Sequence, residues 1–257
     1  MNMIEVKSIK ESNKGSKIDF LGFPIHTYSM DETVQYILDN IRQKRIVNHV
    51  VLNAAKLVYA KKSPILEKAI LNSDLINADG QSIVWGARLL GMNIPERVAG
   101  IDLFFRLMDE FQKAGISVFF LGANANVLDE MLKKVKIRCP NLEIAGYRDG
   151  YFPQDKDKQV CQMINDSNAQ ALFIGISSPK KEIFLLENSA ILKPCFRMGV
   201  GGSFDILAGH TKRAPKMMQN LGLEWLYRIY QEPRRMWKRY AITNTLFLYY
   251  LLKEAMK

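Results

Sequence analysis

Residues 117–200 read SVFFLGANANVLDEMLKKVKIRCPNLEIAGYRDGYFPQDKDKQVCQMINDSNAQALFIGISSPKKEIFLLENSAILKPCFRMGV. Short apolar runs alternate here with longer segments of helical spacing, and the first pattern predicts strands while the second predicts helices. The predicted strands are Ser117–Leu121, Leu142–Tyr147, Ala171–Ile176 and Phe196–Val200. The helices predicted between them are Asn124–Lys136, Lys156–Asn165 and Pro179–Asn188. This alternation is typical of βαβ units, so we expect a mostly parallel sheet with helices on both faces.

The chain before residue 117 continues the pattern. We predict strands at Ile18–Ile25 and Ile46–Asn53, and helices at Asp31–Lys44, Ala54–Lys62, Gln81–Leu90 and Ile101–Lys113. Residues 1–17 are polar and lysine-rich, and we expect them to form a flexible leader. The sequence therefore predicts an α/β domain over residues 18–209, followed by a segment of different character over residues 210–257.

Composition limits the partners and the compartment. The formal net charge is +10, which favours acidic partners such as nucleotides, phosphates, nucleic acid or anionic lipid. The three cysteines are scattered, so neither a disulfide framework nor a metal site is expected, and a reducing compartment is the simpler interpretation. No stretch approaches the roughly 20 apolar residues that span a bilayer. We therefore expect a cytoplasmic protein.

The segment from His210 to Lys257 is rich in basic and aromatic residues. Between Lys212 and Arg239 there are eight basic residues against two acidic ones, a local net charge of +6. On a helix, Arg234, Arg235, Lys238 and Arg239 share one face, while Trp237, Tyr240, Ala241, Phe247, Leu248 and Leu251 fall largely on the other. This pattern favours an interfacial amphipathic helix. The alternatives are a helix packed on the core or in a dimer interface, and a nucleic-acid-binding helix.

Ligands of parallel sheets bind beyond the carboxyl ends of the strands, so candidate site residues are expected in the loops after Asn53, Leu121, Ile176 and Val200 and in the segment around Asp79. Asp79 could act as a general base, or Asn77-Ala78-Asp79-Gly80 could be an ordinary turn. Arg97 could hold a phosphate or form a surface ion pair.

Lys180 and Lys181 lie in the first turn of a predicted helix, against its dipole, which indicates either an anionic ligand or two solvated side chains. The Gly-rich turn with Gly201, Gly202 and Asp205 could let backbone approach a ligand, or could be a tight connection capped by Ser203 or Asp205.

Taken together, these segments resemble the WecG/TagA/CpsF family of bacterial glycosyltransferases over roughly residues 18–245. The segments that carry the resemblance are Leu52-Asn53-Ala54, Asn77-Ala78-Asp79-Gly80, Arg97-Val98-Ala99-Gly100, Ser178-Pro179-Lys180-Lys181-Glu182, residues 199–205 (GVGGSFD), Arg213-Ala214-Pro215, residues 222–228 (GLEWLYR) and residues 231–235 (QEPRR).

The resemblance implies a Rossmann-like body, no required metal or cofactor, and a membrane-docking C-terminal appendage. It also implies an inverting transfer of N-acetylmannosamine or a related sugar from a UDP-sugar to an undecaprenyl-diphosphate-linked sugar, in the synthesis of a cell-surface polysaccharide or teichoic acid. By the same resemblance, Asp79 is the general base, Asn53 binds substrate and Arg97 lies near the diphosphate. The appendage arginines that correspond are Arg228, Arg234 and Arg235. The protein would then act at the inner face of the cell membrane.

Two departures from the family pattern concern the donor sugar. Val51 stands where the family usually has threonine, and Lys181 stands where it usually has glutamine. A donor of the UDP-glucose or UDP-glucuronate type in exopolysaccharide synthesis therefore remains open. We expect no nucleic-acid partner, and a homo-oligomer is open. The rivals from other classes are a non-catalytic nucleic-acid-binding protein and a nucleotide-dependent oxidoreductase, and the absence of a dinucleotide fingerprint disfavours the second.

Overall fold

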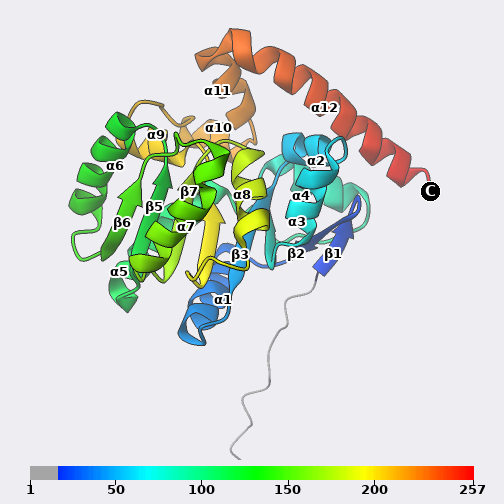
Figure 1. Cartoon of the computed structure of the whole chain (residues 1–257). Helices are drawn as coiled ribbons and strands as arrows, with labels where there is room; N and C mark the ends of the chain where they lie inside the picture. Colours follow the sequence, from blue (N-terminus) through cyan, green and yellow to red (C-terminus); the bar gives the residue numbers. More distant parts are fainter. Residues whose placement is uncertain (1–16) are drawn as a thin grey trace, which may run out of the picture.

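Six parallel strands form the central sheet, in the order β4-β3-β8-β7-β5-β6 (Figure 1). The computed structural model describes residues 17–257, so the predicted leader lies outside the described residues except for Lys17, which is part of β1. The strands of this sheet are β3 Val47–Leu52, β4 Leu75–Ala78, β5 Val118–Gly122, β6 Ile144–Arg148, β7 Ala171–Gly175 and β8 Phe196–Gly199. The predicted α/β class and parallel sheet are confirmed.

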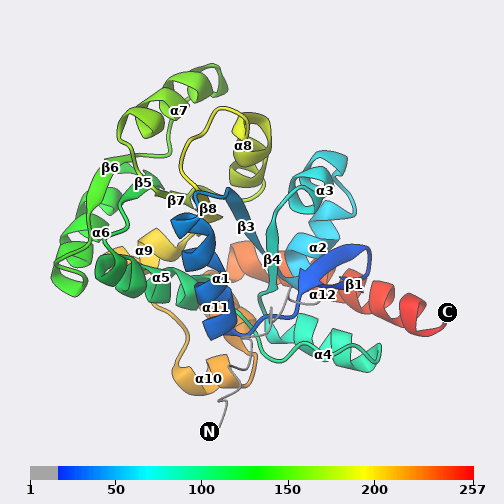
Figure 2. The ribbon, with the colours of Figure 1, turned by 90° about the horizontal axis from the view of Figure 1, so that it is seen from below.

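Helices cover both faces of the sheet, as Figure 2 shows for α1, α5 and α6 on one side and α3, α7 and α8 on the other. Neighbouring strand residues face opposite layers: Phe120 packs with α5 and α6, whereas Phe119 packs with α7 and α8. The helices of the body are α1 Met30–Arg42, α2 Ala54–Ala60, α3 Pro64–Leu71, α4 Gln81–Leu89, α5 Gly100–Ala114, α6 Ala125–Arg138, α7 Asp157–Asp166, α8 Lys180–Asn188 and α9 Ser203–Ala208.

The single strand predicted at Ile18–Ile25 is wrong. The segment is a hairpin of β1 Lys17–Phe20 and β2 Phe23–His26, joined by Leu21 and Gly22, which both have positive φ. The Gly22 amide donates to the Asp19 carboxylate at 2.7 Å and closes the turn. Helix α3 is absent from the sequence-based prediction, although the Ser63-Pro64 pair before it is a helix-start signal.

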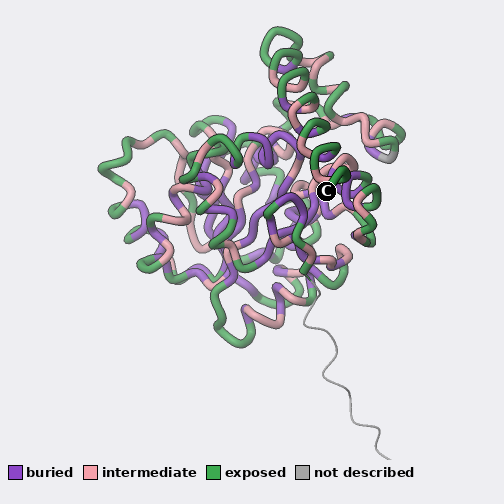
Figure 3. The backbone as a smooth tube through the Cα atoms, turned by 90° about the vertical axis from the view of Figure 1, so that its right-hand side faces the viewer, coloured by how far each residue is buried: buried purple, intermediate pink, exposed green. Residues whose placement is uncertain are grey.

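Three helices follow the body: α10 Lys216–Asn220, α11 Glu224–Gln231 and α12 Pro233–Ala255. The second half of α12 packs on the body, because Phe247 and Leu251 are buried with Phe20 and against Gly86. These two side chains therefore belong to the core and not to an exposed apolar face. Trp237, Leu248 and Leu252 are exposed. Figure 3 shows α11 and the start of α12 as a projection whose residues are mainly exposed or half-buried.

Arg197 of β8 is fully buried and acts as a structural hub. Its guanidinium donates to the carbonyl oxygens of Pro194, Ser189 and Leu192.

Replacing Arg197 by methionine should lower the free energy of unfolding by about 3 kcal/mol or more, because these buried carbonyls lose charge-assisted partners. Urea denaturation measures this loss. The exposed control Arg45→Met should change the same free energy by less than about 0.5 kcal/mol, and an equal effect of the two variants would contradict the structural role.

Candidate active site

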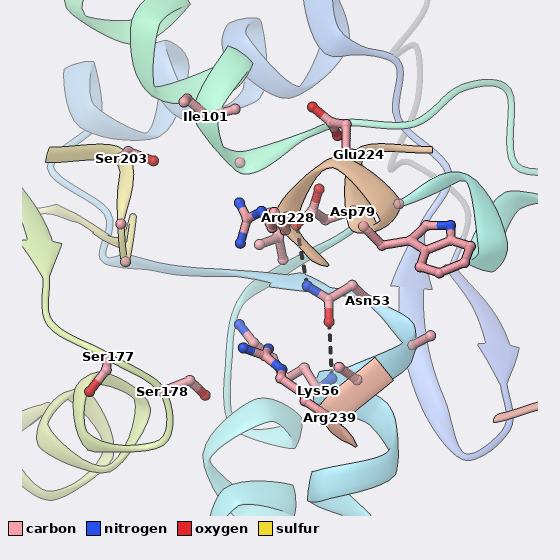
Figure 4. Close-up of a pocket in the computed structure, with 18 of the residues that line it drawn as sticks. Asn53, Lys56, Asp79, Ile101, Ser177, Ser178, Ser203, Glu224, Arg228 and Arg239 are labelled. Atoms are coloured by element: carbon pink, nitrogen blue, oxygen red, sulfur yellow. Dashed lines mark hydrogen bonds between the residues drawn. The ribbon is translucent and has the colours of Figure 1, made fainter. Parts of the chain in front are cut away.

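A cleft of about 1980 Å³ opens at the carboxyl ends of β3, β4, β7 and β8 and runs beneath α11 and α12. Its walls come from loops that are far apart in the sequence, such as those at Asn53, Asp79, Ile176 and Val200. The parallel register brings these strand ends to one edge, which is where ligands of such sheets bind. Figure 4 shows the side chains that line one part of this cleft.

Asp79 follows β4 directly and is held in place by β3. Its amide donates to the Leu52 carbonyl at 2.8 Å, and its carboxylate accepts a 3.4 Å hydrogen bond from Asn53 Nδ2. The Oδ1 atom of Asn53 in turn accepts from the Lys56 amide and caps α2 (Figure 4). Asn53 thus links the end of one strand to the carboxylate at the end of the next.

Burial raises the pKa of the Asp79 carboxyl above its ordinary value, and the charge of Arg97 and the Asn53 hydrogen bond oppose this shift. Glu224 adds a further upward contribution to the pKa. A carboxylate with a raised pKa is a better proton acceptor than a solvated aspartate. The predicted base therefore lies in a cleft that favours proton uptake.

Arg97 lies in the same cleft but is paired with the appendage. Its guanidinium donates to the Glu224 carboxylate of α11 at 2.8 Å, and the other oxygen of Glu224 accepts from Arg213 at 3.3 Å. Arg213 also binds Asp102 of α5 through two nitrogens. This network of two arginines and two carboxylates fastens the start of α11 over Asp79.

Lys181 is buried, so the interpretation of two solvated lysines is wrong for this residue. Its Nζ lies 3.0 Å from Glu182 Oε1, and Nζ of the equally buried Lys56 lies 2.9 Å from the same oxygen. The pKa of Lys181 is lowered to about 8, first by burial and second by the charge of Lys56, while Glu182 opposes the shift. Lys180, its neighbour in sequence, is exposed.

The Gly-rich turn after β8 also lines the cleft. Gly201 has a φ of +54°, and the turn is closed by the Val200 amide, which donates to Ile174 at 2.9 Å. No side chain caps α9: the Ser203 hydroxyl donates back to the Val200 carbonyl. The capping interpretation for Ser203 and Asp205 is therefore wrong, and Gly201, Gly202 and Asp205 all face the cleft.

The basic residues of the appendage divide into two groups. Arg228, Arg235 and Arg239 line the cleft, and Figure 4 shows Arg228 and Arg239 beside it. Arg234, Trp237 and Lys238 are exposed and do not line it. The shared helical face expected from the sequence is thus split between a side toward the cleft and a side toward solvent.

The sequence analysis assigned no site role to three charged residues of this region. Lys56, Arg213 and Glu224 line the cleft and hold its ion pairs. Glu224 is the only acidic residue between Lys212 and Gln231, and this isolation in a basic segment was a usable signal. Lys56 carried no comparable signal, because its partner Glu182 is far away in the chain.

Residues 17–257 contain no group of three or more His, Cys, Asp or Glu side chains that could hold a metal ion. Among the helices of the same residues, none has both the length and the apolar character needed to cross a membrane. Independence from metal stays a prediction.

The fold and the cleft define the class: an α/β protein with one carboxylate of raised pKa among several cations at the carboxyl edge of a parallel sheet. The model of the Glycosyl transferase WecG/TagA/CpsF family matches residues 18–257. The chain therefore belongs to this family, and it is a glycosyltransferase. The resemblance stated from the motifs is confirmed, and the match extends through α12.

Proposed function

We propose that the protein transfers a sugar, with inversion, from a UDP-sugar to a polyprenyl-diphosphate-linked sugar at the inner face of the cell membrane. The observation that carries this proposal is the position of Asp79, half-buried in a cleft that both the body and the appendage supply with cations. A substrate with one reacting hydroxyl and several phosphates matches that distribution of charge.

In the proposed reaction, Asp79 accepts the proton of the acceptor hydroxyl as its oxygen attacks the anomeric carbon. The bond from that carbon to the diphosphate breaks, and UDP departs with the electron pair. Attack from the face opposite the leaving group inverts the anomeric configuration. The expected role of Arg97 and the amide of Gly202 is to stabilise the departing charge. The Gly201 amide donates to the Ile174 carbonyl at 3.3 Å and would have to give up this bond to take part.

In this proposal the appendage, residues 210–257, binds the membrane. Arg234 and Lys238 are exposed beside Trp237, a combination that suits an anionic lipid surface. Arg228, Arg235 and Arg239 face the cleft, where a lipid-linked diphosphate would meet them. In this proposal α12 attaches the enzyme to the membrane, and α11 and α12 together complete the acceptor site.

A direct assay tests the proposal. The protein would be incubated with a panel of UDP-sugars and a polyprenyl-diphosphate-linked acceptor, and the products would be weighed by mass spectrometry. We expect one added hexose, N-acetylhexosamine or uronic acid residue with one donor class, and release of UDP. Omitting the acceptor is the control, because UDP release without it would be hydrolysis. No transfer from any UDP-sugar would refute the proposal.

A further inference from the structure

Two lysines share a single carboxylate at one wall of the cleft, and the charge of an arginine acts on one of them. Lys56 and Lys181 both contact Oε1 of Glu182, and the charge of Arg239 on α12 acts on Lys181 as well. Within residues 17–257, Arg239 forms no ion pair, its buried Nε has no hydrogen-bond partner, and its guanidinium packs on Tyr59. One carboxylate cannot balance three cations, so this wall carries excess positive charge.

The excess charge remains when the other titratable groups around Lys181 are included. Asp79 is close enough to interact with Lys56 and offsets one further charge when it is ionised. His49 lines a cavity of about 120 Å³ on the other side of Lys181, and burial lowers its pKa to about 3, so it is neutral. A buried cation without its own counter-ion is unfavourable unless a ligand supplies one.

The position of Lys181 requires a glycine at residue 199. Its aliphatic stem lies across Gly199, where an added Cβ would come within 2.5 Å of Lys181 Cδ. Any larger residue at 199 would displace the lysine. A Cβ added at Gly201 would lie 4.0 Å from Lys181 Nζ, so the ammonium is beside the turn that lines the cleft.

We propose that Lys181, fixed by Glu182 against Lys56, is an anion-binding subsite for the donor, and that its ligand is a diphosphate oxygen or a carboxylate on the transferred sugar. The proposal rests on the proposed function in so far as the donor is a UDP-sugar. Lys56 and Glu182 position the ammonium, and Lys181 makes the contact. A lysine ammonium carries a positive charge that the neutral glutamine amide lacks. The subsite therefore favours donors with an anionic group at this point.

The test is isothermal titration of UDP, UDP-glucose and UDP-glucuronate into the wild-type protein and Lys181→Gln at pH 7. We expect about 10- to 100-fold weaker binding by the variant, the usual worth of a hydrogen bond to a charged group. Equal losses for all three ligands would assign the diphosphate, and a loss confined to UDP-glucuronate would assign the carboxylate. Unchanged binding of all three would overturn the proposal.

Folding and general electrostatics need separate controls. Lys181→Gln leaves Lys56 paired with Glu182, so thermal melting should show a folded protein, and Lys181→Met tests the same site without a polar head. Lys193→Gln removes an equal charge at an exposed position and should bind all three ligands within twofold of wild type. A matching loss in Lys193→Gln would mean that overall charge, not the subsite, is responsible.

A pH series distinguishes a charged contact from a packing effect. Because the pKa of Lys181 is about 8, wild-type affinity should fall about tenfold from pH 7 to pH 9, as the fraction of protonated lysine falls. Lys181→Gln should lose this dependence. If the wild-type protein bound none of the nucleotides, the proposed function would fail. Titration of inorganic diphosphate at pH 7 would then decide the subsite alone, with equal binding by wild type and Lys181→Gln overturning it.

Discussion

Replacing Asp79 by asparagine should lower the turnover number by about 10²–10⁴, the usual contribution of a general base. Asparagine keeps the shape of the side chain, and its amide oxygen can still accept from Asn53 Nδ2. It cannot take a proton from the acceptor hydroxyl. Binding of UDP should therefore stay close to that of wild type while turnover collapses, which steady-state kinetics and titration measure separately.

The stability of the same variant gives a second readout. A carboxyl whose pKa is raised on folding favours the folded state at low pH, and this contribution is lost as the pH rises through the folded pKa. Ionisation of Asp79 therefore opposes folding, and Asp79→Asn, which keeps this side chain neutral, should melt at the same temperature or higher. A lower melting temperature would show that lost turnover reflects damage to the fold.

The pH dependence of wild-type activity follows from the same shift. The base must be ionised to act, so kcat/KM should rise with pH along a limb that lies above the ordinary aspartate pKa of 3.8. Asp166→Asn, an identical change at an exposed site on α7, should keep turnover within twofold. Near-normal turnover of Asp79→Asn on the true acceptor would remove Asp79 from the mechanism.

The sequence predicted helices and strands correctly where the spacing of apolar residues within a single segment determines the element. The apolar run Ser117–Leu121 became β5, and the helical spacing of Asp31–Lys44 became α1. The hairpin at Ile18–Ile25 was missed because its apolar content reads as one strand. The two positive-φ residues that reverse the chain, Leu21 and Gly22, leave only the glycine as a signal.

The site could be predicted only in part, for a physical reason. Asp79 and the Gly-rich turn are marked by their place after strands, and both face the cleft. The pairing of Arg97 with Glu224 joins residues 127 positions apart, and no periodicity encodes such a contact. The position of Lys181 likewise depends on Gly199 at the end of β8 and on Lys56 of α2, which lie on two other elements.

The exposed charges of α12 should attach the enzyme to anionic membranes. Each basic residue near such a surface contributes about 1 kcal/mol within a Debye length. The double variant Arg234→Gln, Lys238→Gln should therefore bind anionic liposomes about 10- to 30-fold more weakly, as sedimentation measures. Both residues are exposed and lie outside the cleft, so the substrate site remains. Activity should fall on a membrane-embedded acceptor and persist on a short-chain soluble one.

Deleting the chain after Asn220 is a harsher test of the same idea. That chain should lose liposome binding and most activity on the lipid acceptor. It also loses Phe247 and Leu251, which are buried in the core. Removing two such side chains costs about 2–3 kcal/mol each, so the deletion confuses attachment with stability. The charge variant avoids this, because α12 keeps its packing.

The matched control is Lys133→Gln, Lys136→Gln, which removes two exposed charges from α6 on the body. It should sediment with anionic liposomes as wild type does, and wild-type binding should weaken across a salt series because screening shortens the reach of exposed charges. Trp237→Ala should weaken binding to both lipid types, since its contribution is interfacial burial. Equal binding of wild type to anionic and neutral liposomes, or binding to neither, would show that the appendage serves packing or dimer formation instead.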